Sequence, residues 1–143
     1  MERGKKAPYQ SKRAWKKELD EFIDMVPRPV QQHLEGILLA HMTDEGNKQF
    51  ANYVERDGHL RRWPLGTRLK HYLECETAVM MLAASSGSPA WLISHIRLHP
   101  SPAVRGYLGM NSRVGHTEAK RLISEAAKYE VYMRSEKSAA FNR

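Results

Sequence analysis

Apolar side chains recur at helical spacing along most of the chain, and proline, glycine and hydroxyl residues separate the stretches in which they do so. The clearest stripe consists of Trp15, Leu19, Phe22, Ile23 and Val26. This spacing of i, i+4, i+7, i+8 and i+11 predicts an amphipathic helix over 11–26, which the following Pro27 ends. Similar patterns predict a second helix over 29–42 and a third over 44–56, the latter capped by Thr43.

The longest apolar stretch covers 68–85, where Thr67 can act as the N-cap of a helix. Because apolar residues cover a broad part of its surface, this stretch predicts the central helix of a bundle. The preceding segment, 59–66, is basic and interrupted by proline and glycine, so we expect a loop there. Thr117 can cap a last long helix over 118–135.

Two serine–proline pairs mark the starts of two shorter helices. In Ser88-Pro89 and Ser101-Pro102, a hydroxyl can cap the helix and proline takes the first helical position, where its missing N–H costs nothing. These signals predict helices over 89–98 and 102–109. No segment has the alternation of a half-buried strand, so the sequence predicts an all-α protein, a compact bundle of about six or seven helices.

The composition fits one domain, because 41% of the 143 residues are hydrophobic. We expect a flexible basic arm over 1–10, a single helical domain over 11–135 and a frayed tail over 136–143. No apolar run approaches the roughly 20 residues that span a bilayer, and no apolar segment follows the basic start as in a signal peptide. The single cysteine, Cys75, excludes an intramolecular disulfide. We therefore expect a soluble, cytoplasmic protein.

Positive charge exceeds negative charge and is concentrated in three segments. The formal net charge is +7 and the pI is about 9.7. Segments 1–17, 56–70 and 97–121 carry +6, +4 and +4, whereas 18–55 carries −6. An excess of this sign favours a polyanionic partner such as DNA, RNA or an acidic protein surface, and a general basic bias without a partner is the alternative.

The two serine–proline helices and the turn between them resemble the helix-turn-helix of DNA-binding proteins, over residues 76–113. In that resemblance 89–98 is the supporting helix and 102–108 is the recognition helix. The contact residues it implies are Arg97, Ser101, Arg105, Tyr107 and Arg113. Arg105 lies near the start of the second helix, where arginine can read guanine or contact phosphate. The turn lacks the usual glycine and is about one residue longer than standard, so a purely structural helical corner is the alternative.

Further cations lie outside this pair. Arg61, Arg62 and Arg68 form a second stripe of expected phosphate contacts, with Trp63 between them either stacking on a base or filling the core. The amino-terminal cations are Lys5, Lys6, Lys12, Arg13, Lys16 and Lys17. They can follow a phosphate backbone or a minor groove, or form a merely solvated arm.

No catalytic motif is present in the sequence. It contains no glycine-rich phosphate loop and no nucleophile elbow. His95 and His99 have the i, i+4 spacing of metal ligands, but no glutamate of an HExxH motif lies between them and the only cysteine is distant. We therefore expect no enzymatic activity, no metal and no cofactor.

Charge and the helix-turn-helix resemblance together predict a non-catalytic nucleic-acid-binding protein. Duplex DNA is favoured over RNA, and the expected role is transcription control or genome handling. The first alternative is an adaptor that docks on a larger machine such as RNA polymerase or a replication or packaging complex. The second is an RNA-binding protein in which Trp63 or Tyr107 stacks on an unpaired base. An oligomer is compatible with all three.

Overall fold

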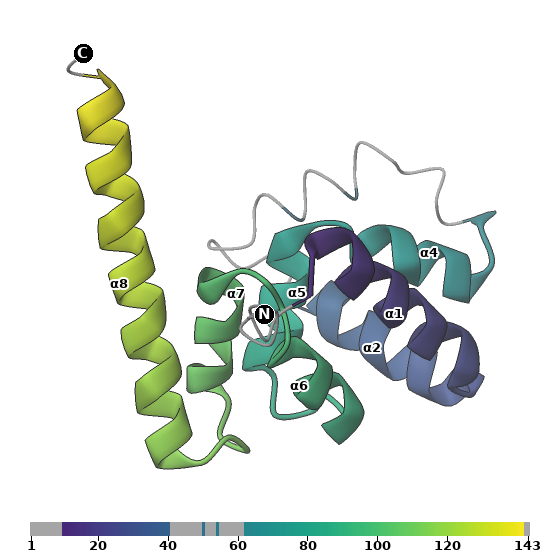
Figure 1. Ribbon diagram of the computed structural model, residues 1–143. Coiled ribbons are helices and arrows are strands. Elements are labelled where there is room, and N and C mark those ends of the chain that lie inside the picture. The colour runs from purple at the N-terminus through teal and green to yellow at the C-terminus, as the bar shows by residue number, and fades with distance from the viewer. Residues whose placement is uncertain (1–9, 41–49, 51–53, 55–61, 142–143) are drawn as a thin grey trace, which may run out of the picture.

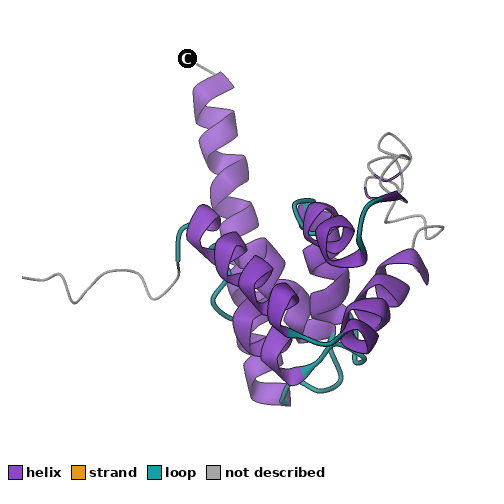
Figure 2. Cartoon of the chain, turned by 90° about the vertical axis from the view of Figure 1, so that its right-hand side faces the viewer, coloured by secondary structure: helices purple, strands orange, loops and turns teal. Residues whose placement is uncertain are grey.

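A computed structural model of the chain consists of helices packed around one apolar core (Figure 1). The structure describes residues 10–40, 50, 54 and 62–141, with side chains described up to residue 135. These residues form seven α-helices and no β-strand (Figure 2), which confirms the predicted all-α class. The helices are α1 (Lys12–Met25), α2 (Arg28–Ala40), α4 (Leu65–Tyr72), α5 (Glu76–Ala84), α6 (Ala90–Ile96), α7 (Pro102–Gly106) and α8 (His116–Phe141), with a 3-10 helix, η4 (Tyr107–Met110), after α7.

Helix α1 forms where the apolar stripe predicts it. The Ser11 hydroxyl accepts a hydrogen bond from the Ala14 backbone N–H at 3.1 Å, which caps the helix. Trp15, Leu19 and Ile23 are buried on the predicted face. Helix α2 follows within one residue of its predicted start. The third predicted helix, over 44–56, lies outside the described residues apart from Phe50 and Val54, which are helical and buried.

The predicted central helix over 68–85 is two helices instead of one. Helix α4 begins at Leu65, so Thr67 lies inside it and Pro64 is the N-cap. The chain leaves the helical conformation at residues 73–75 before α5 starts. Helix α4 buries one face, whereas α5 is buried on nearly all sides. Because apolar residues continue across the break, their spacing alone gives no sign of it.

The two serine–proline pairs behave differently. Ser101 caps α7 as predicted, accepting a hydrogen bond from the Val104 N–H at 3.4 Å, and Pro102 takes the first turn. Ser88 does not cap α6, whose N-cap is Pro89. Its buried hydroxyl donates to the Leu82 carbonyl at 2.6 Å instead. The prediction for Ser88 is wrong because the last carbonyls of α5 also need donors.

Helix α7 packs between α5 and α8. Helix α7 and the following η4 each approach α8 closely at a glycine. A Cβ atom at Gly106 would lie 2.6 Å from the Ala126 Cβ, and one at Gly109 would lie 2.5 Å from the Ile123 Cγ1. Glycine therefore allows this approach of two helix backbones, and α8 covers the helix that the sequence pattern assigned to base recognition.

Helix α8 projects beyond the other helices in both views (Figures 1 and 2). It continues to Phe141, so most of the tail expected to fray is helical. Leu122 joins the core, but several large apolar side chains further along are exposed, including Val131 at 63% and Tyr132 at 57%. No helix in the described ranges is long and apolar enough to cross a membrane.

Candidate nucleic-acid interface

Arg105, the predicted base-reading residue, is buried. Its side chain is 5% exposed, and Nη1 donates a hydrogen bond to the His99 carbonyl. The expectation that Arg105 is exposed for groove contact is therefore wrong. The physical reason is the packing of α7 between α5 and α8, which the local pattern of residues 101–109 does not reveal. Arg105 instead holds the α6–α7 turn.

Arg97 and Arg68 each form a bidentate ion pair with a glutamate. Arg97 donates to the Glu118 carboxylate at 2.7 and 3.0 Å, and Arg68 donates to Glu35 at 2.5 and 3.0 Å. These hydrogen bonds raise the pKa of both arginines and lower the pKa of Glu118. In both arginines a carboxylate occupies the edge formed by Nε and Nη2, one of the edges that can bind a phosphate or guanine, and Arg68 Nη1 donates to the Trp63 carbonyl.

Two other predicted contact residues take part in the turns. The Ser101 hydroxyl is used as the cap of α7. Arg113 is exposed, and its Nη1 donates to the backbone carbonyls of Ser86 and Ser88, which ties the loop before α8 to the loop before α6. Ser101 and Arg113 therefore stabilise turns of the fold. The sequence predicts this role for Ser101 as a helix cap but does not predict it for Arg113.

The remaining predicted residues are not gathered on one surface with Arg105. Tyr107 and Arg62 are exposed, and Arg61 lies outside the described residues. Since Arg105 is buried, it cannot share an exposed face with the basic segment around Arg62. The α6–α7 pair is accordingly a helical corner of the bundle, the alternative that its long turn without glycine already allowed.

Positive charge gathers instead on the first two turns of α1, where Lys12, Arg13 and Lys17 are exposed and Lys16 is partly exposed. Lys12, Arg13, Lys16 and Lys17, here called the basic α1 face, have the spacing i, i+1, i+4 and i+5 and therefore lie on one side of the helix. Arg13 and Lys17 are exposed and form no ion pair with any described residue. Lys12 and Lys16 pair with Glu76 at 3.5 Å and Asp20 at 2.6 Å. This spacing of cations is visible in the sequence and is the signal that points to this surface.

The position of these cations opposes the stability of α1. The first turn of the helix contains no acidic residue and two cations, Lys12 and Arg13. Cations are unfavourable at the amino terminus of a helix, where the dipole is positive, by roughly 0.3 to 1 kcal/mol each. An arrangement that costs local stability points to a role in binding.

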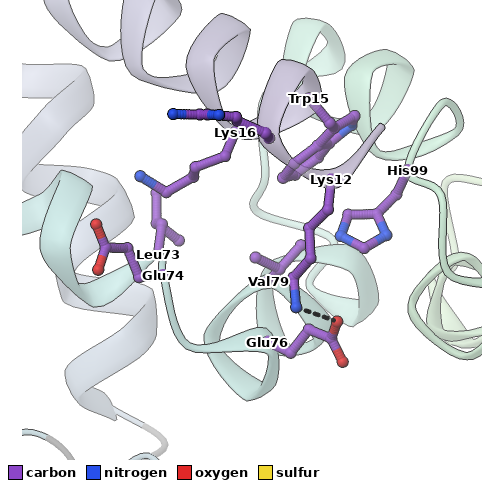
Figure 3. A pocket seen from close by; sticks show the side chains of 9 residues that line it. Lys12, Trp15, Lys16, Leu73, Glu74, Glu76, Val79 and His99 are labelled. Atoms are coloured by element: carbon purple, nitrogen blue, oxygen red, sulfur yellow. Dashed lines mark ion pairs between the residues drawn. The ribbon is translucent and has the colours of Figure 1, made fainter. Parts of the chain in front are cut away.

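A pocket of about 410 Å³ opens beside the basic α1 face (Figure 3). Its walls come from α1, from the turn between α4 and α5, from α5 and from the α6–α7 turn. The lining residues are Lys12, Arg13, Trp15, Lys16, Leu73, Glu74, Glu76, Val79 and His99. The volume lies within the range of small-molecule sites, and the lining combines cations, carboxylates and apolar side chains.

His99 is the buried polar group of this pocket. It is 2% exposed, and its Nδ1 accepts a hydrogen bond from the Ser101 backbone N–H at 3.0 Å. Burial, with added repulsion from Lys12 and Arg105, lowers the pKa of His99 to about 4. The imidazole is therefore neutral near pH 7, and because Nδ1 accepts, the proton is on Nε2.

Trp15 fixes the other side of His99. Its ring lies 4.4 Å from the His99 ring and stacks on His95 at 4.5 Å. The Trp15 indole N–H donates to the His95 carbonyl at 2.7 Å, and the His95 ring bonds the Trp15 carbonyl at 2.9 Å. These contacts join α1 to α6 beside the pocket.

No family model, no curated protein and no solved structure matches the chain.

Proposed function

We propose that the protein binds nucleic acid, without catalysis, through the basic α1 face. The observation that carries the proposal is the placement of Lys12, Arg13, Lys16 and Lys17 on one side of α1, with Lys12 and Arg13 in its first turn, where cations lower helix stability. Arg13 and Lys17 have no carboxylate partner among the described residues, so both are available to phosphates. Lysine and arginine contacts to phosphate supply most of the affinity of sequence-independent binding.

The binding mode follows from which cations are available. Base reading through α7 is not proposed, because Arg105 is buried and Arg97 is paired with Glu118. Contacts from α1 reach the phosphate backbone and carry little sequence information. The roles in transcription control or genome handling and the preference for duplex DNA remain predictions of the sequence.

A pair of matched double variants tests the proposal. In Arg13→Ala/Lys17→Ala, we expect affinity for a fluorescein-labelled oligonucleotide to fall about tenfold at low salt, since two phosphate contacts are lost. The melting temperature should stay the same or rise slightly, because cations leave the positive end of α1. Fluorescence anisotropy and thermal unfolding of the full chain measure the two quantities.

The control removes the same charge elsewhere. Lys120 and Lys128 are exposed on α8 and form no ion pair with a described residue. In Lys120→Ala/Lys128→Ala, affinity should fall less than twofold. Equal losses in the two double variants would show a general charge effect and overturn the assignment to α1, and absence of binding at low salt would overturn the function.

The projecting end of α8 favours one alternative, an adaptor that docks on a protein of a larger machine. Val131, Tyr132 and Met133 are exposed in the second half of α8, beyond the part of this helix that packs against α7 and η4. Clustered exposed apolar side chains favour a protein contact. An adaptor would retain a defined protein from nuclease-treated extract and lose it in Val131→Ser/Tyr132→Ser, whereas retention by both forms would contradict this alternative.

A further inference from the structure

We propose that the pocket beside the basic α1 face binds one nucleotide with an unpaired base, either a free nucleotide or a unit of a single strand. The inference rests on the proposed function, since the same cations would hold the phosphate. Contacts with phosphates alone do not distinguish paired from unpaired bases. The pocket adds a preference for nucleic acid whose bases are accessible.

His99 supplies the first argument. Its ring is 98% buried yet lines the pocket, and it points toward Lys12 and Val79 in Figure 3. Nδ1 is used by the Ser101 N–H, which leaves the Nε2–H as a donor with no partner in the described part of the chain. This N–H is not sealed off from solvent, so a ligand in the pocket can reach it. A ring nitrogen or carbonyl oxygen of a base is an acceptor of the required kind.

The remaining lining distinguishes a nucleotide from a simple anion. Glu74 and Glu76 place two carboxylates at the pocket, which disfavours inorganic phosphate or an acidic peptide inside it. The same carboxylates can accept hydrogen bonds from the amino and ring N–H groups of a base. Leu73 and Val79 provide apolar surface for the faces of the base. The cations of α1 lie at the rim, where the phosphate of the same nucleotide would be.

Size and access favour a single unpaired unit. A pocket of about 410 Å³ accommodates one nucleotide, and bases stacked within a duplex cannot enter it without being flipped out. The Lys12–Glu76 ion pair spans from α1 to α5 at the pocket (Figure 3). Both side chains are substantially exposed, at 73% and 42%, so this pair is weak and can open for a ligand at little cost.

The first test uses the full-length wild-type protein. The imidazole signals of His99 are followed by nuclear magnetic resonance during titration with adenosine monophosphate. In parallel, anisotropy compares an eight-nucleotide single strand with the blunt duplex of the same sequence. We expect saturable shifts of the His99 signals and about tenfold tighter binding of the single strand, the effect of one base contact.

The second test fills the pocket. Val79→Phe should abolish the preference for the single strand and leave duplex binding unchanged, whereas Val131→Phe, the same substitution at an exposed site, should change neither. Unaltered His99 signals together with equal binding of strand and duplex would overturn the pocket inference and leave the proposed function intact. Failure of both oligonucleotides to bind at low salt would overturn the proposed function, and the nucleotide titration then decides the pocket alone. If Val79→Phe does not fold, the wild-type titration still decides.

Discussion

Gly106→Ala should lower the free energy of unfolding by about 2 to 3 kcal/mol. The added Cβ would lie 2.6 Å from the Ala126 Cβ, and both atoms are attached directly to helix backbones. Helices α7 and α8 must therefore move apart, which disturbs the packing around Val104 and Leu122. Alanine is the better helix former by about 1 kcal/mol, so the sign of the change reports whether the approach is as close as described. Denaturant unfolding followed by circular dichroism measures it.

A compensating change provides the control. Adding Ala126→Gly to Gly106→Ala exchanges the two residues across the contact and restores the space. The double variant should return to within about 1 kcal/mol of the wild type, the remaining loss reflecting glycine inside α8. If Gly106→Ala unfolds at the same or a higher denaturant concentration than the wild type, the described crossing of α7 and α8 is wrong.

The stability of the fold should decrease by about 3 kcal/mol as the pH falls from about 6.5 to about 4. Burial lowers the pKa of His99 from 6.5 to about 4 in the folded chain. In this window the unfolded chain binds a proton at His99 and the folded chain does not, so acid favours unfolding. Above pH 6.5 His99 is neutral in both the folded and the unfolded chain, so its titration no longer lowers the free energy of unfolding. Unfolding in urea at several pH values measures the slope.

His99→Asn isolates the effect. The amide oxygen of asparagine can accept from the Ser101 N–H as the imidazole Nδ1 does, but it does not titrate. The variant should lose most of the slope between pH 6.5 and 4. The hydrogen bonds from Arg97 lower the pKa of Glu118, so this carboxylate also loses stability in acid, but it does so equally in wild type and variant and the comparison removes its effect. An identical slope in wild type and variant would contradict the neutral buried imidazole.

Features of the fold that depend on nearby residues could be predicted from the sequence. The stripe containing Trp15 predicts α1, and the Ser101-Pro102 pair predicts the start of α7. The break at residues 73–75 could not be predicted, because apolar spacing is satisfied on both sides of it. The role of Ser88 could not be predicted either, since its hydroxyl donates to the Leu82 carbonyl at the end of α5 instead of capping α6.

The candidate site divides in the same way. The charge of the basic α1 face comes from adjacent residues and is visible in the sequence. The loss of Arg97 and Arg68 as free cations depends on Glu118 and Glu35, which are 21 and 33 residues away along the chain. Arg105 is buried because α7 packs between α5 and α8, and this packing is a tertiary contact that the residues next to Arg105 do not indicate. Local pattern cannot report such pairings.

Binding of phosphates by the basic α1 face should make nucleic-acid affinity strongly dependent on salt. If the four cations of the basic α1 face contact phosphates, the logarithm of the association constant should fall linearly with the logarithm of salt concentration, with a slope of about −3. The slope should be roughly halved in Arg13→Ala/Lys17→Ala and nearly unchanged in Lys120→Ala/Lys128→Ala. Affinity that does not vary with salt, or a slope that the α1 variant leaves unchanged, would contradict binding through the basic α1 face.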